Sequence, residues 1–286
     1  MTTLIDLQHL GNPKVIASYL LGGPEPALVD CGPATCADAL EAGLARAGIE
    51  LADVRHLLVT HIHLDHAGAA GTLVRRHPGL QVHVSEIGAS HLVDPGRLER
   101  SARRLYGDDF DRLWGGLAPV PEENVHVLGK RVLDLEVFPA PGHASHHVAF
   151  LSPDGSCYTG DATGARIHPS SYVVPAAPPP DVDLEGWSRT LAEIERRRPD
   201  RLSIAHFGVF DDPSEHIAAT REGLARWAER VRTGATEEEF VVAAEAEIPP
   251  GTDSVTVQAY GQAAPAWQSY RGLVRYWDKR AEREGG

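Results

Sequence analysis

The chain has 286 residues, of which 42% are hydrophobic and 23% charged; this composition suits one large α/β domain and argues against long disordered stretches. The 27 basic and 40 acidic residues give a net charge of −13, which disfavours nucleic acid as a partner because its phosphates are also negative. We find neither a membrane-length apolar run nor a signal-peptide pattern, so we expect a cytoplasmic protein without a membrane partner.

The predicted elements alternate between short strands and helices. In the first half we expect strands over residues 4–10, 15–21, 27–29, 54–60 and 80–84, helices over 35–47, 67–77 and 86–92, and helical pieces over 97–117. In the second half we expect strands over residues 125–128, 131–138, 147–151, 157–159 and 202–205, a long loop over 162–183 and a helix over 184–197. After Pro213 the chain is mostly helical, ending with residues 267–284. This order suggests two sheets faced by helices.

Three of the 15 histidines fall within one six-residue segment that also contains an aspartate. His61, His63, Asp65 and His66 fall in the loop that joins the strand over 54–60 to the next helix. His61 and His63 are two apart, so in an extended segment their side chains point the same way. Singly, each has an ordinary explanation, such as a helix N-cap for Asp65 or a buried structural role for His61. Four candidate ligands within six residues nevertheless predict a metal site.

Three further residues of the same kind each follow an apolar strand: His143, Asp161 and His206. His206 taken alone favours a structural role. The repetition is the signal, because strand ends are where a rigid scaffold presents functional groups. We therefore expect these residues to converge with the histidine cluster on one edge of the fold.

The combined pattern resembles the metallo-β-lactamase fold hydrolases, nearest to glyoxalase II and acyl-homoserine lactonase-like members. The motifs are His61-x-His63-x-Asp65-His66, Pro141-Gly142-His143, Gly160-Asp161 and His206. The resemblance implies an α/β fold of the αββα sandwich type, with two mixed β-sheets between helical layers and extra C-terminal helices. We expect residues 1–210 to form this domain and residues 211–286 to form a helical extension packed on it.

The resemblance also implies the site. His61, His63 and His143 would bind a first metal ion, Asp65, His66 and His206 a second, and Asp161 would bridge the two. The cofactors would be two divalent ions, zinc foremost, with iron or manganese as alternatives. A metal-bridging hydroxide would cleave an ester, thioester or lactone bond of a small molecule, with Asp65 as the catalytic proton-transfer residue.

Departures from the family pattern leave the substrate open. The stretch His143-Ala144-Ser145-His146-His147 differs from that of glyoxalase II, which disfavours a glutathione thioester. His147 would contact substrate, orient a ligand or simply begin a strand, and we expect His146 to be exposed. Tyr172 in the long loop would contact substrate or only pack. The C-terminal helices would shape the pocket, cap the fold or form a homodimer contact.

Two other functions fit the same motif. One is an iron oxidoreductase like the persulfide dioxygenases of this fold, which use a single metal ion. The other is a metal-binding protein without catalytic activity. The number of metal ions per chain separates the first from the hydrolase.

Overall fold

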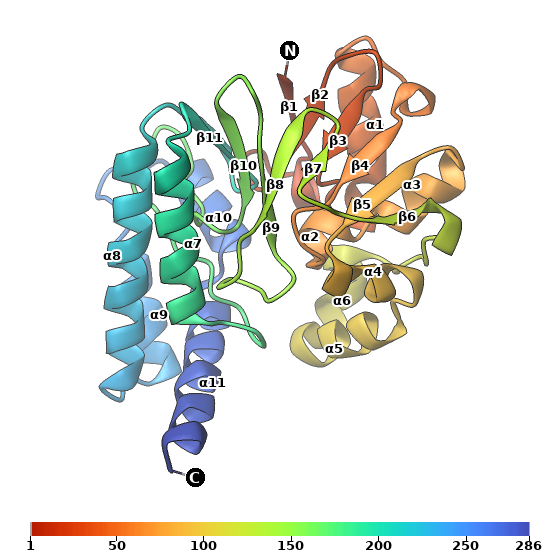
Figure 1. Cartoon of the computed structure of the whole chain (residues 1–286). Helices are drawn as coiled ribbons and strands as arrows, with labels where there is room; N and C mark the ends of the chain where they lie inside the picture. Colours follow the sequence, from red (N-terminus) through yellow and green to blue (C-terminus); the bar gives the residue numbers. More distant parts are fainter. Residues whose placement is uncertain (1, 286) are drawn as a thin grey trace. The chain divides into compact units, whose positions relative to one another are not determined.

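The computed structural model describes residues 2–285, which form two compact units that divide between Phe138 and Pro139. The secondary structure comprises two mixed six-stranded sheets, helices beside them and a further set of C-terminal helices (Figure 1). The predicted fold class is therefore confirmed. The predicted boundary between residues 210 and 211 stays a prediction.

The first sheet has the strand order β1-β2-β3-β4-β5-β6. Its strands are β1 (Thr2–Asp6), β2 (Ala17–Leu21), β3 (Ala27–Val29), β4 (His56–Leu58), β5 (Gln81–Val84) and β6 (Val125–Val127). The first three pair antiparallel, whereas β3 to β6 run parallel to one another. Parallel neighbours end at the same edge, so the segments that follow β3 and β4 lie side by side, and the amide of Asp30 donates to the carbonyl of Leu58.

The helices of the first unit are α1 (Ala37–Arg46), α2 (Leu64–Ala67), α3 (Ala70–Arg76), α4 (Glu86–Val93), α5 (Gly96–Tyr106) and α6 (Phe110–Trp114). Helix α1 contacts β1 and α4 contacts β6 (Figure 1). Leu40 and Leu44 of α1 are fully buried and lie four residues apart, which places them on one helix face. Leu64 at the start of α2 belongs to a core cluster with Phe110 and Trp114, so α6 holds the beginning of α2 in place.

The second sheet has the strand order β12-β11-β10-β9-β8-β7. Its strands are β7 (Arg131–Val132), β8 (Leu135–Pro139), β9 (Val148–Leu151), β10 (Ser156–Gly160), β11 (Arg201–Ile204) and β12 (Gly208–Phe210). Strands β10 and β11 are parallel, and β9 and β12 pair antiparallel with them. The carboxyl ends of β10 and β11 therefore lie at the same edge.

The C-terminal helices all belong to the second unit. They follow α7 (Leu184–Arg197) as α8 (Pro213–Arg232), α9 (Glu237–Glu245), α10 (Ser254–Ala263) and α11 (Ala266–Gly285). Helix α8 lies against α7, and α11 contacts both α8 and α9 (Figure 1). The indole rings of Trp187 and Trp227 are among the largest fully buried side chains. Within residues 2–285, no helix combines the length and apolarity that crossing a membrane requires.

Several predicted boundaries were wrong for identifiable backbone reasons. The strand expected over residues 4–10 ends at Asp6, because Gln8 and Leu10 have left-handed φ values of 47° and 57°. The single strand expected over 131–138 is a hairpin, which turns where Leu133 has a φ of 52°. The helix expected over 67–77 begins earlier, at Leu64, and is divided into α2 and α3. Strand β12 was not predicted.

Candidate metal centre

The predicted cluster of the first unit forms two close pairs of donor atoms. His61 Nε2 lies 3.1 Å from His63 Nδ1. His66 Nε2 lies 3.8 Å from Asp65 Oδ1. His61 and His66 are fully buried, whereas the Asp65 side chain keeps 20% of its surface exposed. The structure therefore brings all four predicted residues of this segment together, with one carboxylate open to solvent.

Asp30 orients this cluster, and the sequence analysis missed it. Its Oδ1 accepts a hydrogen bond from the Thr60 amide at 2.8 Å. Its Oδ2 accepts from the Thr60 hydroxyl at 2.7 Å and from His66 Nδ1 at 2.8 Å. A signal was available, because Asp30 directly follows a strand, as does Asp161, while His143 and His206 come within four residues of a strand end. Asp30 has a φ of 56°, a left-handed value that Asp tolerates better than most residues.

These hydrogen bonds fix which nitrogen of each ring carries the proton. Because Asp30 accepts from His66 Nδ1, the neutral His66 ring keeps its lone pair on Nε2. The Thr60 hydroxyl has given its one proton to Asp30, so it accepts from His61 Nδ1 at 3.1 Å. His61 therefore also presents an Nε2 lone pair. A buried carboxylate behind the ligands is the usual device that sets the tautomer of a metal-binding histidine.

The three predicted residues of the second unit converge on one carboxylate. His143, Asp161 and His206 follow β8, β10 and β11. Asp161 Oδ2 lies 3.4 Å from His143 Nε2, and Asp161 Oδ1 lies 3.4 Å from His206 Nε2. All three side chains are almost completely buried. Each oxygen of Asp161 thus faces a different imidazole, and the predicted convergence holds for these three residues.

A tight packing contact positions His143. Its Nδ1 donates to the carbonyl of Ala176 at 2.7 Å, which leaves Nε2 as the acceptor nitrogen. The preceding residue, Gly142, has a φ of 136°, and a Cβ atom there would lie 2.3 Å from the backbone of Trp187. Only glycine fits this approach of the loop to α7, which explains the Pro-Gly-His sequence in physical terms.

His147 lies beside Asp161 as a supporting group. Its Nε2 accepts a hydrogen bond from the Asp161 amide at 3.2 Å, and the ring is buried. This favours the expected role of orienting a ligand, while substrate contact by His147 stays a prediction. The expectation that His146 is exposed was wrong, since only 9% of it is accessible. Ser145 takes the exposed position instead and donates to Asp181 at 2.7 Å.

The loop over residues 162–183 is anchored at several points by helices of its own unit. Trp187 Nε1 donates to the Ala162 carbonyl at 2.6 Å. The Thr220 hydroxyl of α8 donates to the Thr163 carbonyl at 2.9 Å. From α11, the Ser269 hydroxyl accepts from the amide of Ala177 at 3.0 Å. The neighbouring carbonyl, that of Ala176, orients His143, so the C-terminal helices support a candidate ligand indirectly.

Tyr172 in this loop is bound to the C-terminal region. Its hydroxyl donates to Glu247 at 2.8 Å, and its carbonyl accepts from the Tyr260 hydroxyl at 2.6 Å. Arg226 and Arg230 also donate to Glu247. Burial raises the pKa of Glu247, but these hydrogen bonds outweigh burial and bring it down to about 2. These contacts favour the packing role for Tyr172, and its contact with substrate stays a prediction.

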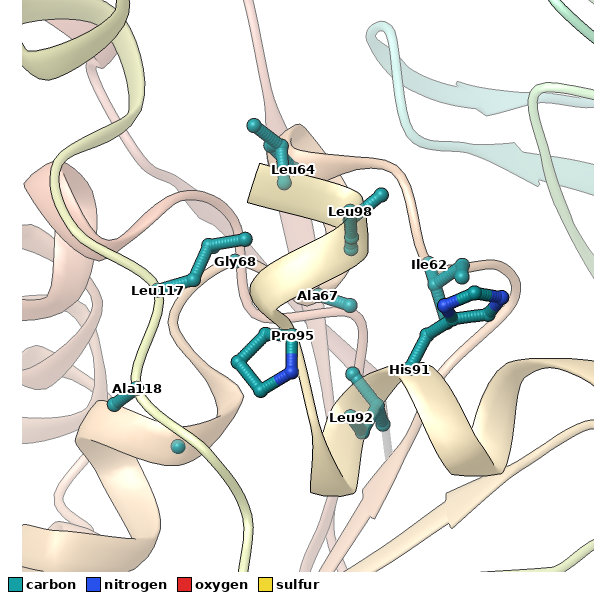
Figure 2. Close-up of a pocket in the computed structure, with 11 residues that line it drawn as sticks. Ile62, Leu64, Ala67, Gly68, His91, Leu92, Pro95, Leu98, Leu117 and Ala118 are labelled. Atoms are coloured by element: carbon teal, nitrogen blue, oxygen red, sulfur yellow. The ribbon is translucent and has the colours of Figure 1, made fainter. Parts of the chain in front are cut away.

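The apolar residues between the histidines of the segment 61–66 line a small hollow in the first unit. Ile62 and Leu64 alternate with the histidines, and Figure 2 shows them beside Leu98 and His91. Leu92 and Pro95 complete this part of the lining (Figure 2). In an extended segment alternate residues point to opposite sides, which separates the apolar anchors from the imidazoles. The hollow is small, about 10 Å³, so these side chains serve chiefly to hold the loop.

The donor set fits divalent metal ions. His143 Nε2 carries a lone pair, and it faces a carboxylate oxygen at 3.4 Å, so two acceptor atoms confront each other. A cation between such atoms converts their repulsion into attraction. Imidazole nitrogens with a few carboxylates suit zinc, iron or manganese. His61, His63, His66 and Asp65 supply the same kinds of donor in the first unit.

These features define an α/β protein with residues that could hold metal ions, and the comparison with known families agrees. The chain matches the family described as the metallo-beta-lactamase superfamily over residues 11–206, and it belongs to that superfamily. The match contains all seven predicted ligands.

Three relatives of known sequence are each 27–29% identical to this chain, and their names differ. YobT of Bacillus subtilis is 27% identical over 173 residues, which cover 57% of this chain and 72% of the relative. A hydroxyacylglutathione hydrolase of Chromohalobacter salexigens is 29% identical, covering 58% of this chain and 60% of the relative. The probable metallo-hydrolase YqjP of Bacillus subtilis is 28% identical, with 66% of each chain covered.

Solved structures with the same fold extend over nearly the whole chain. ST1585 from Sulfolobus tokodaii superposes with a TM-score of 0.68 at 21% identity, covering 95% of this chain and 97% of its own. TTHA1429 from Thermus thermophilus gives a TM-score of 0.69 at 21% identity, covering 99% and 94%. At this identity the likeness concerns the fold alone.

Proposed function

We propose that this protein is a dinuclear metallohydrolase that cleaves an ester, thioester or lactone bond of a small molecule. His61, His63 and His143 would hold one ion, and Asp65, His66 and His206 the other. Asp161 would bridge the two ions. Membership of the superfamily and the chemistry of the donors support joining these residues into one centre.

One observation carries the proposal. The two oxygens of Asp161 face the Nε2 atoms of two different histidines, each at 3.4 Å. A carboxylate that served a single ion would not need an imidazole beside each oxygen. This arrangement therefore favours two ions over the single ion of an iron oxidoreductase.

The residues of the chain divide the work between binding and proton transfer. When bound, the ions would polarise the scissile carbonyl and lower the pKa of water far below its value in bulk, to roughly 7. Asp30 and the Ala176 carbonyl keep the histidines in the tautomer that offers Nε2. Asp65 is the partly exposed carboxylate of the set, so its oxygens can take the proton of the attacking water and pass it to the leaving group.

The substrate class rests on relatives and on the departures from their pattern. A hydroxyacylglutathione hydrolase is among the relatives, which favours a thioester. Ala144 and His146 replace the residues that follow Pro-Gly-His in glyoxalase II, which disfavours glutathione as the carrier. We therefore propose an ester, lactone or thioester whose leaving group is not glutathione.

Metal analysis combined with a substrate panel tests the proposal. Two ions per chain and turnover of at least one ester, thioester or lactone are expected. Asp161→Ala should lower bound metal and reduce turnover by roughly 10³-fold or more, because metal ions contribute several kcal/mol to such reactions. Asp154→Ala is the matched control: this carboxylate, in the turn before β10, is outside the ligand set and should change neither quantity.

Single substitutions in each unit test whether the two halves form one centre. His66→Ala and His206→Ala should remove the same ion, so the double variant should lose no more metal than either alone. Additive losses would contradict a shared ion. One iron per chain with oxygen consumption on a persulfide would overturn the hydrolase, and two ions without turnover on any substrate would favour a non-catalytic protein.

A further inference from the structure

A second group of histidines lies on the sheet of the first unit, apart from the ligand set above. His56, His83 and His126 come from the adjacent strands β4, β5 and β6. His56 Nδ1 lies 3.0 Å from His83 Nε2. The ring centroids of His56 and His83 are 5.1 Å apart, and those of His83 and His126 are 5.2 Å apart.

Strand register explains why the three rings gather. His83 is the direct partner of His126, and His56 is the partner of Gln81, two residues before His83. Residues two apart on a strand share a face, so all four side chains project from the same side of the sheet. Gln81 Oε1 accepts from His126 Nε2 and completes a row of three imidazoles and one amide. Parallel strands keep this row in place independently of the metal loop.

The accessibility of the row suits an ion that enters from solvent. His56 and His83 are half-buried, and His126 on the edge strand is exposed. Burial, followed by the neighbouring rings His56 and His126, lowers the pKa of His83 to about 4. Burial likewise lowers the pKa of His56, against the opposing effect of Glu25. These two imidazoles are therefore neutral near pH 7, the form that binds metals.

We propose that His56 and His83 chelate an additional divalent transition-metal ion, with His126 as third ligand and the side-chain oxygen of Gln81 (Oε1) available as a fourth. Three imidazoles and one oxygen suit zinc, nickel or copper rather than magnesium or calcium. His56 Nδ1 and His83 Nε2 are close enough to contact one ion once the proton of their hydrogen bond moves to the other nitrogen of its ring. The exposed His126 ring has to turn out of its stack on His83 to complete the site. An ion held here would cross-link three parallel strands.

Equilibrium dialysis of the full-length protein against Ni²⁺ measures the additional ion by difference. The unaltered protein and these variants retain all seven ligands of the proposed dinuclear centre, so the Ni²⁺ that this centre binds cancels in the difference. The unaltered protein should bind one equivalent more at saturation than His83→Ala. His126→Ala should weaken the additional site by at least the ~10–100-fold that loss of an outer-shell partner costs other metal sites. His126 is exposed, so this variant should fold normally even if His83→Ala does not.

His91→Ala is the matched control, since this half-buried histidine belongs to the same unit but lies on α4 outside the row. It should bind as much Ni²⁺ as the unaltered protein. The Cu²⁺ form gives a second readout, because electron paramagnetic resonance should show nitrogen couplings that His83→Ala reduces. Equal Ni²⁺ binding by the unaltered protein, His83→Ala and His126→Ala would overturn the proposal. A loss in His91→Ala as large as that in His126→Ala would overturn it as well.

Asp161→Ala separates this inference from the proposed function. That variant should lose metal from the proposed dinuclear centre and retain the equivalent held by His56 and His83. Retention of activity in His83→Ala together with loss of one Ni²⁺ equivalent would show that the second site is independent of turnover.

Discussion

The two units supply candidate metal ligands in different ways. In the first unit four candidate ligands fall within six residues, and one buried carboxylate, Asp30, orients two of the histidines through short contacts. In the second unit three candidate ligands come from three separate strand ends, and a loop that the C-terminal helices hold supports one of them. The first set therefore depends on one loop and one buried carboxylate, and the second on contacts spread over the entire unit.

This contrast predicts that substitutions elsewhere in the chain affect the two sets of candidate ligands to different degrees. Changes far from the ligands should disturb the second set more than the first, because His143 depends on α7 and on the loop over 162–183. Changes at Asp30 should act on the first set with little effect on the C-terminal helices. Four variants test the contrast, in order of decreasing expected effect.

Gly142→Ala should have the largest effect on stability. The new Cβ would meet the Trp187 backbone at 2.3 Å, at a φ of 136° that alanine rarely adopts. We expect a loss of about 2–5 kcal/mol in the free energy of unfolding, measured by urea titration, together with loss of activity. Gly261→Ala is the control, because its Cβ meets nothing within 4 Å and it lies in α10. A stable, active Gly142→Ala protein would refute the close approach.

Asp30→Asn should weaken the first set of ligands. The amide retains the size of the side chain but replaces one acceptor oxygen with a donor, which conflicts with the hydrogen bonds from Thr60 and His66. Metal affinity or activity should fall by about 10–100-fold, as for other outer-shell partners. Asp38→Asn, at an exposed site on α1, should leave both unchanged. Unaltered metal affinity in Asp30→Asn would break the comparison between the units.

Ser269→Ala should test the support from α11. The buried hydroxyl accepts from the Ala177 amide, and its removal leaves that amide without this partner. We expect a loss of about 1–2 kcal/mol in stability and faster hydrogen exchange at Ala177. Ser188→Ala, at an exposed position of α7, is the control. If exchange at Ala177 is the same in both variants, α11 does not hold the loop.

The smallest effect concerns pH. The pKa of Glu247 is lowered to about 2, so its ionised form stabilises the fold at any pH above its unfolded value, near 4.5. That contribution is lost as the pH falls from about 4.5 towards 2. Thermal unfolding should show a steeper loss of stability in this range for the unaltered protein than for Glu247→Gln. Glu245→Gln, which is exposed on α9, should behave like the unaltered protein.

Much of the fold could be predicted because the strands have clear apolar patterns. The strand Ala27–Val29 and the helix Leu184–Arg197 have the predicted bounds. Two of the wrong boundaries lie where single residues adopt left-handed backbone angles, as at Gln8, Leu10 and Leu133. Periodicity carries no information about such residues, because the angle is set by what the next segment packs against. The short strand Gly208–Phe210 pairs with β11 and has too few residues to show a period.

The supporting residues were the least predictable part of the site. Asp30 and Trp187 carry no motif, and each acts through partners far away in the sequence. Only the strand-end position of Asp30 offered a clue. The row of His56, His83 and His126 was equally hidden, because its members lie on three strands that become neighbours only when the sheet forms.

The sequence by itself determined the donor chemistry of this protein. His61, His63, Asp65 and His66 have the side-chain chemistry and spacing of metal ligands wherever that loop is placed, and Gly142 indicates a close contact. Tertiary structure alone decided which atom of each ring faces the site and that the two oxygens of Asp161 serve two histidines. The reason is physical: side-chain chemistry is a property of the residue, whereas tautomer and orientation depend on hydrogen bonds from residues that only folding brings together.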